Sequence, residues 1–189
     1  MLSMADAHVV LYRSAFSSGE ADDLFRELRQ AIGWRQETIR LFGRIVQIPR
    51  LSAWHGDKPY TYSGLIMNPE PWTPPLMAIK RRTEELSGRR FNSVLLNLYR
   101  DGRDSVAWHG DTIGRGSSHD TMVAIVSVGD PRRLMLRPRG GGESLSFELG
   151  HGDLLVMGGS CQRTWEHAVP KVASAGPRLS VQFRPFGVF

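Results

Sequence analysis

The run FNSVLLNLYR, residues 91–100, marks the point at which the sequence turns into short strand-like segments. Its polar and apolar side chains alternate near the end, as in a β-strand with two different faces. Five further runs follow, with glycine-containing turns between them: 121–129, 132–139, 143–149, 152–158 and 178–185. So many short strands predict a sheet that is folded as a sandwich or jelly roll.

Two helices are predicted upstream of these strands. The first has Ser17 or Ser18 as its cap, an apolar face at helical spacing, and its end at Gly33. The second starts at Thr73-Pro74-Pro75 and stops at Gly88. Helices followed by many strands indicate an α+β fold, with the N-terminal helices packed on one sheet.

The composition indicates one domain over residues 1–189. No apolar run is long enough to cross a bilayer, so we expect no membrane partner. The single cysteine, Cys161, and the absence of a secretory pattern at the N-terminus predict a cytoplasmic protein. A formal net charge of +5 makes nucleic acid a candidate partner, although a solvated basic surface explains the same charge. The sequence does not indicate an oligomeric state.

A candidate metal site begins at Trp108-His109-Gly110-Asp111. In an extended segment His109 and Asp111 point to the same face, so an imidazole and a carboxylate can share one metal ion. We select His167 as the third ligand. Two histidines and one carboxylate form the facial triad of non-haem Fe(II) oxygenases. A His-x-Asp pair alone is also found as an ordinary surface pair, and that alternative stays open at this point.

A candidate anion site lies on two strands. Arg178 and Arg184 share the polar face of residues 178–184 and could hold the two ends of a small dicarboxylate. Asn97 and Tyr99 share one face of the strand at 91–100 and could bind the same ligand. A solvated basic edge strand and an ordinary polar strand face are the alternative interpretations.

Taken in order along the chain, these motifs resemble the AlkB-like family of Fe(II)- and 2-oxoglutarate-dependent dioxygenases. The resemblance rests on Asn97–Gly102, on Asp104–Asp111, on His167, and on Arg178 through Arg184. It implies a double-stranded β-helix, with a jelly-roll catalytic core at residues 91–189.

The resemblance also implies the ligands of the site. Fe(II) would be held by His109, Asp111 and His167, which would form the catalytic centre. The cosubstrate 2-oxoglutarate would be held by Asn97, Tyr99, Arg178 and Arg184, with Arg178 at the distal carboxylate and Arg184 nearer the metal, and O2 would be the second cosubstrate.

Residues 1–90 would hold the helices and a nucleotide-recognition region, which Pro49-Arg50-Leu51 and Tyr60–Gly64 resemble. Trp54 and Tyr60 would line the mouth of the substrate pocket, where aromatic rings can stack on an extruded base. Packing in the core is the alternative for Trp54. The implied activity is oxidative demethylation of alkylated bases in DNA or RNA, of the DNA-repair type.

One position departs from the family pattern. DNA-repair members often carry a second acidic residue two positions after the metal aspartate, and Ile113 stands there in this chain. Asp120 is a candidate substitute. The departure keeps two other readings open: a dioxygenase that acts on a tRNA base, a protein or a metabolite, and a catalytically silent nucleic-acid-binding module.

Overall fold

The computed structural model describes the chain except for residues 1, 5–6, 42, 63–64, 112–119 and 186–189. Its centre is a seven-stranded sheet in the order β1-β2-β13-β10-β15-β8-β5. The bounds are β1 Leu2–Met4, β2 Ala7–Tyr12, β13 Asp153–Gly159, β10 Val123–Gly129, β15 Arg178–Arg184, β8 Ser93–Tyr99 and β5 Leu51–Gly56.

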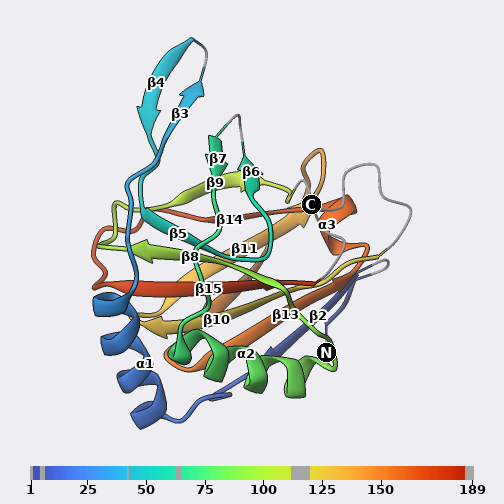
Figure 1. The fold of residues 1–189 in the computed structure, drawn as a ribbon. Helices are drawn as coiled ribbons and strands as arrows, with labels where there is room; N and C mark the ends of the chain where they lie inside the picture. Colours follow the sequence, from blue (N-terminus) through green and yellow to red (C-terminus); the bar gives the residue numbers. More distant parts are fainter. Residues whose placement is uncertain (1, 5–6, 42, 63–64, 112–119, 186–189) are drawn as a thin grey trace.

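A four-stranded sheet faces the central one (Figure 1). Its order is β12-β11-β14-β9, with β12 Leu145–Leu149, β11 Arg132–Pro138, β14 Trp165–Val169 and β9 Val106–His109. Every pairing in both sheets is antiparallel. Two facing antiparallel sheets confirm the predicted double-stranded β-helix.

Two hairpins and a short helix complete the strand layers. The hairpins are β3 Thr38–Leu41 with β4 Arg44–Gln47, and β6 Tyr60–Tyr62 with β7 Leu65–Met67. Both stand out on the side of the molecule away from the helices (Figure 1). The short helix α3, Cys161–Thr164, lies between β13 and β14.

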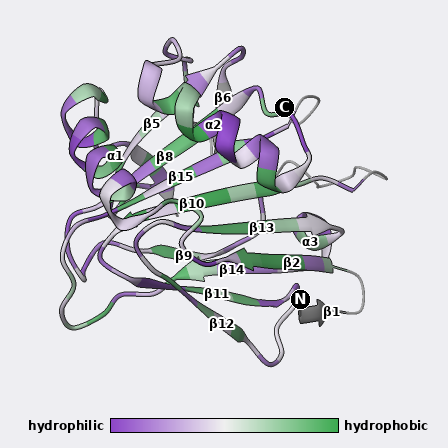
Figure 2. Cartoon of the chain, turned by 90° about the horizontal axis from the view of Figure 1, so that it is seen from below, coloured by the Kyte–Doolittle hydropathy of each residue, from purple (hydrophilic) through white to green (hydrophobic). Residues whose placement is uncertain are grey.

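Both long helices cover the outer face of the central sheet, as predicted (Figures 1 and 2). Helix α1, Ser18–Ala31, begins at the cap Ser17, whose hydroxyl accepts the backbone N–H of Glu20 while the Glu20 side chain accepts the N–H of Ser17. Helix α2, Pro74–Ser87, ends at Gly88, which has a left-handed φ of 67°. None of the described helices is long and apolar enough to cross a membrane.

Alternation along β8 and β15 divides the core into two layers. Residues 94, 96 and 98 of β8 and residues 179, 181 and 183 of β15 pack toward the helices. The intervening residues face the second sheet, where they line a cavity. The same alternation therefore supplies both a helix-facing core and a polar cavity wall.

Residues 34–72, where short strands and loops are expected from the sequence, contain β5, whereas β2 was not predicted. Strands β2 and β5 lie before residue 90, yet they belong to the same sheet as β8 and β15. The expected boundary between residues 1–90 and a core at 91–189 is therefore not a boundary in the structure. Strands β9 and β14, which carry the candidate metal ligands, were also not predicted as strands.

Candidate metal centre and anion pocket

The three predicted metal ligands lie together at one end of the cavity between the sheets. Strands β9 and β14 are antiparallel neighbours, and His109 is directly opposite His167 in their register. One ligand atom from each of His109, Asp111 and His167 falls within 4.8 Å of the others. Residues 58 positions apart in sequence thus meet because two strands pair.

The histidine rings are held in orientations suited to metal binding. Nδ1 of His109 lies 2.9 Å from the carbonyl oxygen of Ala107, so Nδ1 carries the proton and Nε2 is the ring nitrogen that can ligate a metal. That Nε2 atom lies 3.9 Å from Oδ1 of Asp111. The ring of His167 is 4.2 Å from the ring of His109, centroid to centroid.

Burial and charge set the protonation states that a metal needs. Burial, reinforced by the nearby His109, lowers the pKa of His167 to about 3, so its imidazole is neutral at physiological pH. Burial alone would raise the pKa of Asp111, but the positive charge of Arg184, followed by the two imidazoles, outweighs it and holds the pKa below 3.8. A neutral histidine and an ionised carboxylate are the forms that ligate divalent metals.

The predicted anion ligands line the same cavity. The register between β8 and β15 places Arg178 opposite Tyr99 and Ser180 opposite Asn97, all facing the second sheet. Arg184 donates from Nη2 to Oδ2 of Asp111 over 3.2 Å, which puts it beside the metal ligands. Arg178 lies six residues away along the strand.

Arg178 is a buried cation whose hydrogen-bond acceptor and ring partner are neutral. It is 2% exposed, donates from Nε to the Ser127 hydroxyl over 3.0 Å, and stacks on the Tyr99 ring at 5.2 Å. Burial lowers its pKa to about 10, so it stays charged at neutral pH. Among the residues that the structure describes, no carboxylate forms an ion pair with it. An uncompensated buried guanidinium in a cavity is an anion-binding group.

The structure describes the side chain of only one of the two predicted substrate residues, Trp54. Trp54 is 1% exposed, packs with Met67 and Leu95, and donates from its indole to the Lys58 carbonyl over 2.8 Å. Its ring is covered and does not line the cavity, so the expectation of a stacking platform is corrected in favour of core packing. The backbone of Tyr60 begins β6, but its side chain lies outside the described residues, as does Ile113.

The candidate carboxylate Asp120 and two further histidines do not belong to the metal cluster. Asp120 is exposed and pairs with Arg163 over 2.6 Å, away from the cavity lining. His55 and His151 lie outside the metal cluster. His55 contacts the Pro71 carbonyl over 2.6 Å, and His151 accepts from the Gly129 N–H over 2.8 Å and lies 3.3 Å from the Asp22 carboxylate.

Sequence reasoning missed three residues of the site. Arg50 lines the cavity and donates from Nε to Oδ1 of Asn97 over 3.0 Å, which turns the Asn97 amide nitrogen away from it. Ser127 accepts from Arg178, and the guanidinium of Arg132 lies over the Tyr99 ring at 5.5 Å. Two of the three left a signal: Arg50 within Pro49-Arg50-Leu51, and Ser127 as a polar residue inside the apolar strand VAIVSVG.

Comparison with known proteins agrees with this geometry. Residues 8–184 match the 2OG-Fe(II) oxygenase superfamily. The human protein named alpha-ketoglutarate-dependent dioxygenase alkB homolog 3 is 40% identical over 192 residues, which cover 94% of this chain and 66% of that protein. The mouse protein named DNA oxidative demethylase ALKBH2 is 34% identical, over 92% of this chain and 78% of that protein.

The chain thus spans just under two thirds of the human alkB homolog 3 protein. The solved structure of OsALKBH1 superposes with a TM-score of 0.67 at 15% identity, covering 98% of this chain and 100% of that one, which shows a common fold. The resemblance drawn from the sequence is confirmed, and the chain belongs to the 2OG-Fe(II) oxygenase superfamily and, within it, to the AlkB-like proteins.

Proposed function

We propose that this protein is an Fe(II)- and 2-oxoglutarate-dependent oxidative demethylase of alkylated bases in nucleic acid. The observation that carries the proposal is the convergence, in one cavity, of the His109–Asp111–His167 cluster and the buried cation Arg178. A metal site beside an anion site is what an enzyme that uses a keto-diacid on iron requires.

The residues fit both groups. Two neutral imidazoles and one carboxylate suit Fe(II), and their second contacts, Ala107 for His109 and Arg184 for Asp111, fix their orientation. When bound, Fe(II) with 2-oxoglutarate and O2 supplies the oxidising chemistry that hydroxylates an N-methyl group. One oxygen atom of O2 goes to succinate, with loss of CO2, and the other goes to the methyl carbon, which leaves as formaldehyde.

The chain contributes positioning and charge, together with apolar side chains over part of the cavity wall. Arg178 would bind the distal carboxylate, with the Tyr99 ring beside it, and Asn97 would donate its amide N–H groups to the cosubstrate. Apolar side chains of Ile48, Met67 and Leu95 line the rest of the cavity wall, where they would exclude water and contact the face of a base.

Two further lines support nucleic acid as the substrate. The mouse relative is named a DNA oxidative demethylase, and the net charge of +5 favours a polyanion. We also propose a cytoplasmic location, which the single buried cysteine Cys161 supports.

The test is to incubate the protein aerobically with Fe(II), 2-oxoglutarate and a methylated oligonucleotide, and to measure formaldehyde and succinate. We expect both products in equal amounts, and neither from the His109→Ala variant. If succinate is formed but no methylated oligonucleotide yields formaldehyde, the protein is a dioxygenase whose substrate is a protein or a metabolite. If no succinate is formed under any condition, the protein is a catalytically silent nucleic-acid-binding module.

A further inference from the structure

We infer that the cavity selects alkylated bases that are neutral over those that are cationic, and that Arg50 sets this preference. The observation behind this inference is that, among the described residues, the guanidinium of Arg50 has no ion-pair partner and the cavity lining contributes a single carboxylate. The inference rests on the proposed function and names the substrate class of the same site.

The described lining of the cavity carries an excess of positive charge. Three guanidiniums face it, from Arg50, Arg178 and Arg184, and Asp111 is its one carboxylate. Asp111 is itself engaged by Arg184 and is the predicted metal ligand. Binding of Fe(II) with the 2-oxoglutarate dianion adds no net charge, so the excess persists in the loaded site.

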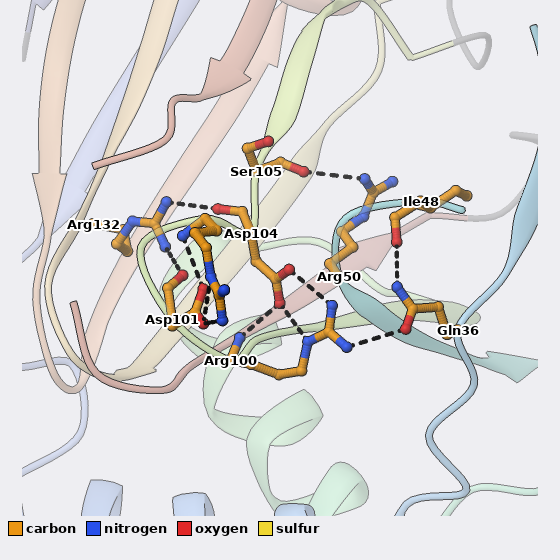
Figure 3. Close-up of polar contacts among 9 residues, drawn as sticks. Gln36, Ile48, Arg50, Arg100, Asp101, Asp104, Ser105 and Arg132 are labelled. Carbon is orange, nitrogen blue, oxygen red and sulfur yellow. Dashed lines mark hydrogen bonds and ion pairs between the residues drawn. The ribbon is translucent and has the colours of Figure 1, made fainter. Parts of the chain in front are cut away.

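Arg50 differs from Arg100 and Arg103 in the partners that it meets. Figure 3 shows Arg100 in a fork with the carboxylate of Asp104, at 2.8 and 2.9 Å. Arg103 pairs in the same way with Asp101, at 2.7 and 3.1 Å. These cations are neutralised.

Among the described residues, Arg50 reaches only neutral acceptors. One is the amide oxygen of Asn97 at 3.0 Å, and the other is the carbonyl oxygen of Ser105 at 3.4 Å (Figure 3). Within the described part of the chain, no carboxylate forms an ion pair with it. Its charge is therefore available to act on whatever occupies the cavity.

Apart from Asp111, no carboxylate among the described residues lines the cavity to offset this charge. The segment 112–119, which follows the metal aspartate, reads TIGRGSSH and contains neither aspartate nor glutamate. Asp120 is paired with Arg163, and Glu70 is paired with Arg35 at 3.3 Å. Neither of these two carboxylates lines the cavity that holds His109 and Asp111.

The charge of the base depends on which atom carries the methyl group. Methylation at N1 of adenine or N3 of cytosine creates a cation, because those nitrogens carry no proton to lose. Methylation at N3 of thymine or N1 of guanine replaces a proton and leaves the base neutral. The apolar wall formed by Ile48, Met67 and Leu95 accepts the face of either kind. A guanidinium in the cavity wall repels only the cation, and we expect this repulsion to lower kcat/KM for cationic bases by about tenfold or more.

The experiment compares four oligonucleotides of one sequence that differ in a single base: N3-methylthymine, N1-methylguanine, N3-methylcytosine or N1-methyladenine. We expect kcat/KM for the two neutral lesions to exceed that for the two cationic lesions by about tenfold or more. Arg50→Gln should reduce this ratio by about the same factor. Arg50→Lys keeps the charge and loses the planar guanidinium. It should preserve the ratio while lowering kcat/KM for the neutral and the cationic lesions alike.

The ratio of kcat/KM for neutral and cationic lesions separates the effect of the Arg50 charge from its effect on cosubstrate positioning. Because Arg50 also holds Asn97, its loss weakens cosubstrate binding for all four substrates alike, and this common factor cancels. Arg133→Gln removes the same charge from an exposed position on β11 and should leave the ratio unchanged. Binding of the four oligonucleotides to the metal-free protein, followed by fluorescence anisotropy, should rank them in the same order without any turnover.

The outcomes separate the two proposals. Formaldehyde from oligonucleotides at equal rates, or faster from the cationic lesions, would overturn the charge selection and leave the proposed function intact. A uniform fall across all four for Arg50→Gln, with the ratio unchanged, would overturn the charge selection by Arg50 and leave it as a residue that positions Asn97. Formaldehyde from none of the four would overturn the proposed function and this inference with it.

Discussion

Arg184 donates to Asp111 across 3.2 Å, and both side chains are almost fully buried, at 1% and 4% exposure. The guanidinium keeps the metal-ligating carboxylate ionised although burial opposes the charge. A carboxylate that must remain charged before the metal arrives needs such a partner, because an unpaired buried charge is costly.

Arg184→Met should therefore destabilise the metal-free protein by about 3–5 kcal/mol, since it strands the Asp111 carboxylate in the cavity. Chemical denaturation of the metal-free protein measures this loss. Added Co(II), a spectroscopic stand-in for Fe(II), should recover part of the stability by supplying the missing positive charge. An unchanged free energy of unfolding would show that the pair contributes nothing to Asp111.

His109→Ala should abolish decarboxylation of 2-oxoglutarate and leave the fold intact. Its ring is on the edge of the cavity with the side chain 22% exposed, so its removal costs little packing. Succinate production measures the loss, and circular dichroism checks the fold. Undiminished succinate production by this variant would show that His109, Asp111 and His167 do not form the catalytic metal site.

Arg178→Ala should weaken 2-oxoglutarate binding by roughly 2–5 kcal/mol, because Arg178 is a desolvated cation that would meet a carboxylate. Titration of the Fe(II)-loaded protein without oxygen, followed through its visible charge-transfer band, gives the affinity. Arg82→Gln, on the far side of the sheet in α2, is a matched control that should bind normally. Equal affinity in the two variants would exclude Arg178 from the cosubstrate site.

The metal-free protein should lose stability in mild acid because of His167. The unfolded chain takes up a proton at this residue near pH 6.5, whereas the folded protein resists protonation until the pKa of about 3. This contribution is complete above pH 6.5 and declines as the pH falls toward 3, with a slope of up to about 1.4 kcal/mol per pH unit. Denaturation curves at pH 7.5, 6 and 5 measure it, and His167→Gln should flatten the difference between them. Parallel pH profiles for both proteins would contradict the assignment.

Trp54→Ala should lower the free energy of unfolding by about 3–5 kcal/mol, because it leaves an empty space in the core where the indole packs against Met67 and Leu95. The free energy of unfolding in urea measures this cost. Trp54→Phe fills most of the space and should recover much of it, with normal affinity for a methylated oligonucleotide. A stable Trp54→Ala variant that binds the oligonucleotide poorly would restore Trp54 as a stacking residue.

Much of the fold could be read from local patterns. The six strand-like runs correspond to β8, β10, β11, β12, β13 and β15, with ends that differ by one or two residues. Both helix starts followed from capping chemistry, at Ser17 and Thr73. Strands β9 and β14 could not be read, because each is short and its burial differs from a regular alternation.

The sequence by itself determined which residues carry chemistry and which face of each strand they occupy. The period of two puts Asn97 with Tyr99 and Arg178 with Arg184, and this pattern is local. Tertiary structure alone decided which of these residues meet. Register between distant strands brings His167 to His109 and sets Arg184 against Asp111. The position of Arg50 against Asn97, and of Trp54 beneath the cavity wall, depends on the same long-range pairing of β5 with β8. Pairing between strands far apart in the chain is set by how the whole hydrophobic core packs, and no short segment contains that information.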